Sequence, residues 1–284
     1  MNFQATSLGF IGAGQMAEAL IKGVQTSKET HFQKIICYDL NPKRHDYLQK
    51  KYAVTPASSL QELVAQVDIC ILAVKPQNMT ELLAQLTSLS PEVDLTTILF
   101  VSIAAGITLA FLQKYCPELR RVVRVMPNTP CFVSAGMSAL SANKSLPKGD
   151  LLIVKTIFEV VGKTIIVEEH QLDIITALSG SGPAFFYQLV QNFVAAGVVG
   201  GLDASIALPL VTQTMLGAAK MIQHNPHQTI EQLIQAVASK GGTTEAGLKI
   251  LQNSTLATIQ QDTITAAFER SQELAQKKKE DSKK

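Results

Sequence analysis

The first half of the chain alternates short β-rich segments with helical segments, and this order constrains the fold more than any other feature. The β-rich segments are residues 8–12, 34–39, 68–74, 97–103 and 121–126, with residues 164–167 as a sixth candidate. Such alternation is typical of a parallel sheet whose strands are joined by crossover helices. Because these crossovers are right-handed, the sequence predicts an α/β fold with a doubly wound parallel sheet.

Residues that favour the first turn of a helix follow several of these segments. Asn, Ser and Thr side chains cap a helix by accepting a backbone N–H, and proline fits the first helical position. The candidate helix starts are Asn41 with Pro42, Ser58, Thr108 and Pro147. From residue 171 onward no segment resembles a strand, so we expect a sheet domain at residues 1–167 and an all-α domain at residues 168–276. Residues 277–284 are rich in lysine and predict a disordered charged tail.

Length, charge and hydropathy narrow the class of protein. The 284 residues exceed the roughly 100 to 200 residues of one typical domain. A formal net charge of +2 is too small for a nucleic-acid-binding surface, so we expect no nucleic-acid partner. The most apolar stretch, residues 184–202, is interrupted by three amide side chains, which favours a buried helix over a membrane span.

The cysteines and histidines lack the spacing of a metal site. Asn225-Pro226 separates His224 from His227 and implies a turn between them, so we expect no metal. No CxxC pair is present, and the N-terminus has no basic segment of a signal peptide, so a reducing, cytoplasmic setting fits the chain. The cysteines are Cys37, Cys70, Cys116 and Cys131.

A glycine-rich turn joins the first expected strand to the first expected helix. It reads G-x-G-x-x-A, the dinucleotide-binding fingerprint of a Rossmann-type sheet, in the strand-turn-helix context that this motif requires. A tight turn without Cβ atoms lets a pyrophosphate approach the helix N-terminus. The alternative is a glycine turn that only packs. The expected cofactor contacts in this turn are Gly12, Ala13, Gly14, Gln15 and Met16.

The end of the second expected strand leaves the choice of cofactor open. Asp39 stands where an acidic side chain usually takes the ribose hydroxyls of NAD. Asn41, Lys43 and Arg44 follow at once, and the two cations could hold a 2′-phosphate. An ordinary solvated helix face explains Lys43 and Arg44 equally well. We therefore expect NADPH or NADH as the cofactor.

Four further motifs follow along the chain. They are Ala73-Val74-Lys75-Pro76, Met126-Pro127-Asn128-Thr129-Pro130, Leu178-Ser179-Gly180-Ser181-Gly182-Pro183-Ala184 and Gly241-Gly242-Thr243-Thr244. In this order and spacing they resemble the pyrroline-5-carboxylate reductases over nearly the whole chain. The resemblance implies reduction of 1-pyrroline-5-carboxylate to L-proline by hydride transfer from NAD(P)H, the last step of proline biosynthesis. It also implies cofactor contacts at Ser58, Ala73, Val74, Lys75, Pro76 and Ala105, and substrate contacts at Glu169, Ser239, Gly241, Gly242, Thr243 and Thr244.

The last motif suits the substrate that this resemblance implies. A carboxylate and a C=N bond require an anion holder and a polar group near the imine nitrogen. Residues 239–244 read as a glycine loop that turns into a helix, whose free N–H groups can hold the carboxylate. We expect the Thr244 hydroxyl to hydrogen-bond the imine nitrogen as the catalytic group. No stronger acid is needed because an iminium can enter already protonated, and a plain helix cap is the alternative.

Two positions depart from the family pattern. Lys240 stands where proline is usual, and Glu245 stands where a small or apolar residue is usual. The charge of Lys240 could assist the substrate carboxylate. Glu245 in the first turn suits the helix dipole but opposes an anionic ligand. Both departures concern substrate affinity rather than the type of reaction.

Two other functions are alternatives to this one. A 3-hydroxy-acid dehydrogenase would carry a catalytic lysine four residues after Gly182, where this chain has Phe186. Alcohol oxidation needs that base, whereas imine reduction does not. A dinucleotide-sensing regulator is the non-enzymatic alternative, and turnover of NAD(P)H with the imine distinguishes the two.

The helical half contains more apolar helix surface than the other helices of one chain can cover. Between residues 174 and 219 the only charged residue is Asp203, and a helix that is apolar on every side must be surrounded. We expect segments 184–202 and 204–222 to be covered partly by a second subunit with two-fold symmetry. The resemblance points the same way, to homodimers gathered most often into homodecamers. Residues 168–276 would then serve both substrate binding and dimerisation.

Overall fold

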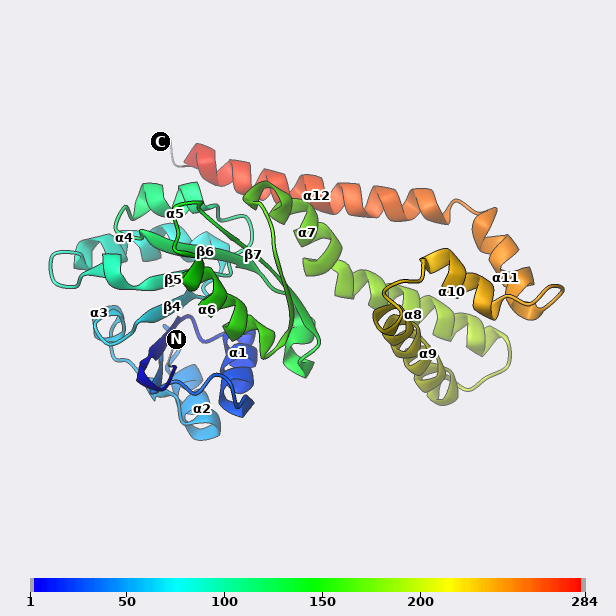
Figure 1. The fold of residues 1–284 in the computed structure, drawn as a ribbon, viewed down its shortest axis with the longest axis horizontal. Coiled ribbons are helices and arrows are strands. Elements are labelled where there is room, and N and C mark those ends of the chain that lie inside the picture. The colour runs from blue at the N-terminus through cyan, green and yellow to red at the C-terminus, as the bar shows by residue number, and fades with distance from the viewer. Residues whose placement is uncertain (1–2, 282–284) are drawn as a thin grey trace. The chain divides into compact units, whose positions relative to one another are not determined.

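One eight-stranded sheet forms the centre of the first half of the chain in the computed structural model, which describes residues 3–281 (Figure 1). The strand order is β3-β2-β1-β4-β5-β6-β7-β8, and β6 and β7 form the one antiparallel pair. This order is the doubly wound Rossmann-type arrangement that the sequence predicts. The strands are β1 Ser7–Ile11, β2 Lys34–Tyr38, β3 Thr55–Pro56, β4 Ile69–Leu72, β5 Leu99–Ser102, β6 Arg121–Met126, β7 Gly136–Ala142 and β8 Gly162–Ile166.

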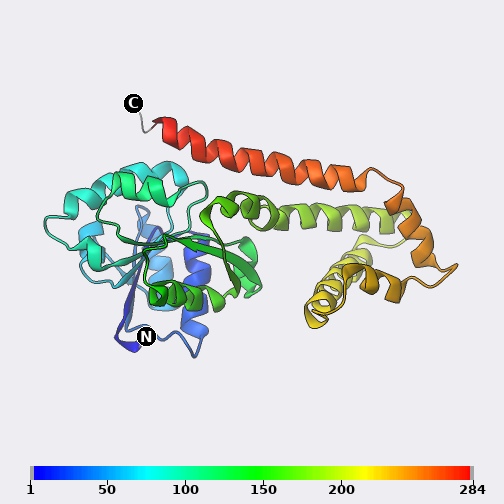
Figure 2. The same ribbon diagram turned by 45° about the horizontal axis from the view of Figure 1, so that its top comes forward.

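Helices cover both faces of this sheet (Figure 2), because the central strands are apolar on both sides. On one face, α3, α4 and α5 enclose a core that contains Cys70 and Phe100. On the other face, α1 and α6 pack on Phe10 and Val123. The helices of this part are α1 Gln15–Thr26, α2 Pro42–Tyr52, α3 Leu60–Val64, α4 Met79–Leu89, α5 Leu109–Tyr115, α6 Lys148–Glu159 and α7 Leu172–Ile175.

The rest of the chain is helical, and the protein divides into two compact units. Met1–Ser181 with Ala267–Lys284 form the first unit, and Gly182–Ala266 form the second. Within the second unit α8 and α9 pack together where Gly197 approaches Ala207, whose side chain is the one buried hydrophobic side chain of residues 182–266. The helices are α8 Gly182–Val199, α9 Ala204–His224, α10 Ile230–Val237, α11 Thr243–Gln252 and α12 Leu256–Asp281.

The predicted strands and helix starts agree with these elements except at three places. β3 and β7 were not predicted, since β3 has two residues and the β7 sequence GMSALSA contains no β-branched side chain. Helix α3 is capped by the hydroxyl of Ser59 rather than that of Ser58. The other three starts are confirmed, with Asn41 and Thr108 capping α2 and α5 through their side chains and Pro147 preceding α6.

The border between the units lies later in the chain than the change to helical sequence at residue 168. Leu172 on α7 is fully buried, and the Ser271 hydroxyl of α12 donates to the Asp173 carboxylate at 2.9 Å. These contacts keep residues 168–181 and the end of α12 in the first unit. Residues 277–281, which the sequence assigns to a disordered tail, form the end of α12, and residues 282–284 lie outside the described residues.

Candidate functional site

The glycine turn lies where β1 passes into α1, beside the segment that follows β4. Gly12 has a φ of 95°, and a Cβ there would lie 2.7 Å from the Ala73 carbonyl oxygen and 3.0 Å from the Val74 nitrogen. Only glycine accommodates both this backbone conformation and this close approach. Because β1 and β4 are parallel neighbours, their carboxyl ends bring two of the predicted cofactor segments together.

Gly14 leaves open space at the N-terminus of α1. Among residues 3–281, a Cβ on Gly14 would meet no atom within 4 Å, and no side chain caps the helix. The first N–H groups of a helix have no partner within it, and they carry the positive end of the helix dipole. This turn therefore has the room and the donors that a pyrophosphate requires.

Asp39 is already engaged by two backbone amides. Its Oδ2 accepts from the Ala13 amide at 2.6 Å, and its Oδ1 accepts from the Asn41 amide at 2.8 Å. The backbone N–H of Asp39 donates to Nε2 of His45 at 2.8 Å, which holds this turn from the other side. The carboxylate thus fixes the glycine turn, and further lone pairs of its two oxygens remain for ribose hydroxyls.

Arg44 also contacts the glycine turn. Its Nε donates to the Ala13 carbonyl oxygen at 2.7 Å, and its Nη2 pairs with Glu18 at 2.9 Å. Lys43, by contrast, is exposed. The sequence gives no reason to distinguish these two basic residues, but the structure does. Arg44 is held beside the turn, and Lys43 extends into solvent.

Glu18, on α1, is the centre of this charged cluster. Besides Arg44, its carboxylate accepts from Tyr47 at 2.7 Å and from Lys51 and Tyr52 at 3.2 Å. Partial burial would raise the pKa of Glu18, but these hydrogen bonds outweigh burial and lower the pKa to about 2. The sequence does not reveal this cluster around Glu18, because a lone glutamate in a helix gives no sign of four donors from another helix.

Ser58 and Lys75 are exposed near the ends of β3 and β4. The Ser58 amide donates to the Glu62 carboxylate at 2.7 Å, and the Ser58 hydroxyl donates to the same oxygen at 2.5 Å. These two contacts lower the pKa of Glu62 below its usual value. Any cofactor contact from the Ser58 hydroxyl would therefore have to share it with Glu62.

The segment around Ala105 follows β5 at the same edge of the sheet. Gly106 has a φ of 72°, and a Cβ there would lie 3.5 Å from the Ala275 backbone nitrogen. The end of α12 therefore packs against this predicted cofactor segment.

Two of the motifs that define the family resemblance also meet within the first unit. Asn128 accepts from the Met137 amide at 2.8 Å and donates to the Ser179 carbonyl at 3.2 Å. A Cβ on Gly180 would lie 2.5 Å from the Met126 methyl group. Residues Thr176–Gly180 form a π-helical turn, a feature that is frequent at functional sites.

Glu169 is bound to Arg124 and to the start of α5. Its Oε1 accepts from the Leu109 amide at 2.7 Å and from Arg124 Nη1 at 3.2 Å. Arg124 is 4% exposed on β6, opposite Ser102 on β5. Arg124 was not among the predicted site residues, and the sign available in the sequence was a charged residue inside an otherwise apolar strand.

The predicted substrate loop lies in the second unit. Gly241 has a φ of 75°, Gly242 is the N-cap of α11, and the half-buried Thr244 is in the first turn of this helix. The Gly242 amide donates to the Ser239 carbonyl at 3.0 Å, so Ser239 closes the turn through its backbone. Thr243, the first residue of α11, is exposed. The loop therefore combines the free N–H groups of a helix N-terminus with a threonine in the first turn of the helix.

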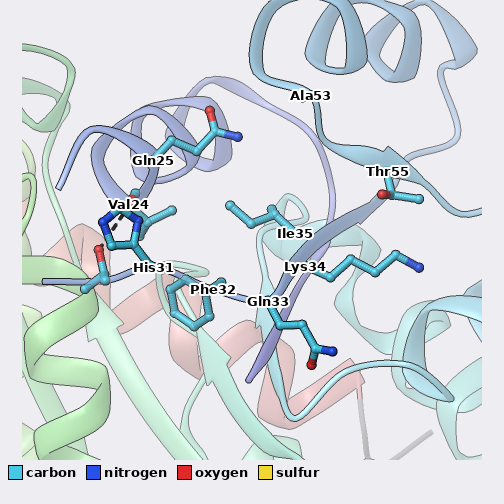
Figure 3. Close-up of a pocket in the computed structure, with 10 residues that line it drawn as sticks. Val24, Gln25, His31, Phe32, Gln33, Lys34, Ile35, Ala53 and Thr55 are labelled. Carbon is cyan, nitrogen blue, oxygen red and sulfur yellow. Dashed lines mark hydrogen bonds between the residues drawn. The ribbon is translucent and has the colours of Figure 1, made fainter. Parts of the chain in front are cut away.

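A separate hollow of ≈ 310 Å³ lies near the amino end of β2 (Figure 3). Val24, His31, Phe32 and Lys34 are among its lining residues, and the Thr30 hydroxyl donates to the Val24 carbonyl at 3.2 Å. None of the predicted site residues lines it. Within residues 3–281, no cluster of three or more His, Cys, Asp or Glu side chains could hold a metal ion.

The chain matches two known protein families. Residues 169–274 match the family described as pyrroline-5-carboxylate reductase dimerisation, and residues 7–106 match the family described as NADP oxidoreductase, coenzyme F420-dependent. The pyrroline-5-carboxylate reductase of Synechocystis sp. is 37% identical over 95% of this chain and 98% of its own. Pyrroline-5-carboxylate reductase 2 of Bacillus subtilis is 37% identical over 87% of each chain.

Solved structures show the same similarity in three dimensions. A pyrroline-5-carboxylate reductase from Coxiella burnetii superimposes with a TM-score of 0.87 at 33% identity, covering 95% of this chain and 99% of the other. The Plasmodium falciparum pyrroline carboxylate reductase with NADP bound gives 0.84 at 30% identity, covering 96% and 100%. An imine reductase from Myxococcus stipitatus, at 18% identity and a TM-score of 0.55, shares the fold.

Proposed function

Because the chain belongs to the pyrroline-5-carboxylate reductase family, we propose that the turn at Gly12 and the segments after β2, β4 and β5 form a cofactor edge of the sheet. The loop at the start of α11 would bind the substrate. The protein reduces 1-pyrroline-5-carboxylate to L-proline, the last step of proline biosynthesis. It is an oxidoreductase that uses NADPH or NADH. The observation that carries the assignment of the cofactor edge is the contact of Gly12 with Ala73 and Val74, which only a glycine allows.

The cofactor edge would hold the dinucleotide through the turn at the start of α1 and the segments after β2, β4 and β5. The open space at Gly14 and the free N–H groups of α1 suit the pyrophosphate. Asp39 suits the ribose, and Arg44 with Lys43 suits a 2′-phosphate. When bound, the nicotinamide supplies the hydride.

The loop of residues 239–244 would hold the substrate. The N–H groups at the start of α11 would bind the carboxylate. The Thr244 hydroxyl would orient the substrate nitrogen, donating to a neutral imine or accepting from the N–H of a protonated iminium. An iminium that enters protonated needs no further acid. Glu169 Oε1 is taken by Leu109 and Arg124, so Oε2 is the oxygen of Glu169 that remains for the substrate.

The protein forms a homo-oligomer, and residues 169–274 match a dimerisation family. The exposed apolar side chains of α8 and α9 support a dimer in which a partner subunit covers them. They are Phe186, Tyr187, Phe193, Val198, Val199, Ile206, Leu208, Leu210, Leu216, Met221 and Ile222. We propose that such dimers gather into decamers, and light scattering coupled to size exclusion would measure this mass.

For the location we propose the cytoplasm. Within the described residues one helix, α9, is long and apolar enough to cross a membrane by length and composition alone. A subunit interface explains the same apolar surface, and the family match favours it. The four free, buried cysteines suit a reducing compartment. Fractionation of the cells that make the protein, with detection in the soluble or membrane fraction, would test the proposal.

Turnover tests the assignment of the site. Purified protein should oxidise NADPH or NADH in the presence of 1-pyrroline-5-carboxylate and release proline in equal amount. Substitution of Thr244 should lower this rate, whereas the same type of change at Thr156 on α6 should not. Full activity after removal of the Thr244 hydroxyl would contradict the proposed substrate loop.

A further inference from the structure

The loop that precedes α11 contains a carboxylate of the chain's own. Glu245, the third residue of α11, reaches back so that its Oε2 accepts from the Gly241 amide at 2.6 Å. A glutamate at this position usually accepts from the N-cap amide. Here the N-cap amide, that of Gly242, already donates to Ser239, and Glu245 binds one residue earlier.

This contact changes which donors remain for a ligand. The amides of Gly241 and Gly242 are both taken, so Thr243, Thr244 and Glu245 supply the helix N–H groups that no carbonyl of their own helix can accept. An anion on these groups would lie in the same turn as the Glu245 carboxylate. Two negative charges this close repel each other where water only partly screens them.

The glutamate has a second position available. Lys249, one turn further along α11, lies 3.8 Å from Oε1 of Glu245. The side chains of Glu245 and Lys249 are 38% and 68% exposed, so neither is fixed by packing. A small rotation of the Glu245 side chain would release the Gly241 amide and strengthen the ion pair with Lys249.

We infer that Glu245 competes with the substrate carboxylate for the start of α11 and thereby sets the enzyme's affinity for carboxylate ligands. This inference rests on the proposed substrate loop. In the empty site the Glu245 carboxylate takes the Gly241 amide. A bound carboxylate displaces it toward Lys249, and the repulsion that remains weakens the binding of both substrate and product.

The test compares Glu245→Gln with the wild type. Glutamine keeps an oxygen that can accept from Gly241 but removes the charge. The KM for 1-pyrroline-5-carboxylate and the inhibition constant of cyclopentanecarboxylate should each fall on the order of 10-fold at low ionic strength. Inhibition by the uncharged cyclopentanecarboxamide should not change. The differences in KM and in the inhibition constant between the variant and the wild type should become smaller in high salt. A purely structural role of Glu245 would not produce this dependence on salt.

A matched control is Glu231→Gln, which removes an exposed acidic residue from the first turn of α10. It should leave both constants at their wild-type values. Equal inhibition constants for wild type and Glu245→Gln, or weaker carboxylate binding by the variant, would overturn the inference. If Thr244→Val impairs turnover while Glu245→Gln matches the wild type, only the role of Glu245 fails. If Thr244→Val has no effect, the substrate loop is wrong and this inference falls with it.

Discussion

The carboxylate of Asp39 accepts a hydrogen bond of 2.6 Å from the backbone amide of Ala13, and so joins the end of β2 to the glycine turn after β1. Arg44 binds the carbonyl oxygen of the same residue. The acidic side chain proposed for the ribose and the basic side chain proposed for a 2′-phosphate therefore both contact Ala13. We therefore expect a coupling between the choice of cofactor and the shape of the glycine turn.

This coupling leads to a prediction for the two basic residues. Replacing both Lys43 and Arg44 with alanine should raise the KM for NADPH, because the charges that suit a 2′-phosphate are lost. The KM for NADH should change less. Since only Arg44 contacts the glycine turn, the single Lys43→Ala variant should affect NADPH alone, whereas Arg44→Ala should also have a smaller effect on NADH. Equal effects on both cofactors for the double variant would mean that the pair does not contribute to binding a 2′-phosphate.

Glu18 provides a prediction about stability and pH. Its folded-state pKa of about 2 lies below the usual value of 4.5, so its contribution to stability is complete above pH 4.5. That contribution is lost as the pH falls from about 4.5 to 2. Glu18→Gln should therefore unfold at lower denaturant concentration than the wild type at pH 7, and the difference should narrow through this acidic range.

The matched control for this pH experiment is Glu29→Gln, at an exposed glutamate in the loop before β2. Its unfolding midpoint should follow the wild type at every pH. A Glu18→Gln difference that stays constant from pH 7 to pH 3 would show that the carboxylate charge contributes nothing and that only packing was changed.

Gly12 is the position where the structure most strictly requires glycine. Gly12→Ala would place a Cβ 2.7 Å from the Ala73 oxygen and would force a φ of 95° on an L-residue. The conformational cost alone is roughly 1 to 2 kcal/mol. We expect a lower melting temperature and a raised KM for both cofactors, because the turn must move away from β4.

Gly149→Ala is the control, since a Cβ on this glycine of α6 would meet no atom within 4 Å. Alanine is favoured over glycine inside a helix by roughly 0.5 to 1 kcal/mol, so this variant should be as stable as the wild type or more stable. Equal melting temperatures for Gly12→Ala and the wild type would contradict the close packing of the two loops.

The parts of this protein that the sequence predicts are those fixed by local rules. The glycine turn, the Asn41 cap with Pro42 and the Thr108 cap each depend on a few neighbouring residues. β7 was not predicted because its residues have little intrinsic preference for a strand. Pairing with β6 and β8 holds this segment in the sheet. Arg124 and Glu18 were missed for a related reason, since their partners lie 45 and 26 or more residues away in sequence.

Thr244 is the expected catalytic residue. Thr244→Val keeps the shape of the side chain and removes its hydroxyl, so kcat/KM for 1-pyrroline-5-carboxylate should fall by about 10-fold or more. The KM for the cofactor should change little. Thr156→Val on α6 removes a hydroxyl that only binds its own helix at Leu152, and it should keep wild-type kinetics. A wild-type kcat/KM for Thr244→Val would remove Thr244 from the mechanism.

The last prediction concerns the apolar surface of the second unit. A single chain buries one hydrophobic side chain, that of Ala207, among residues 182–266, and such a helical unit lacks a core of its own. A second subunit that covers α8 would bury Val194 further, and an unpaired carboxylate placed there would cost several kcal/mol. Val194→Glu should therefore give inactive or insoluble protein.

The control for Val194→Glu is Leu152→Glu, at an apolar residue that is 56% exposed on α6 in the first unit. It makes a similar change of an apolar helix residue to glutamate, and it should yield soluble, active oligomer. Light scattering at the protein concentration of the activity assay gives the mass of each variant. A Val194→Glu protein that is monomeric and fully active would rule out the proposed interface.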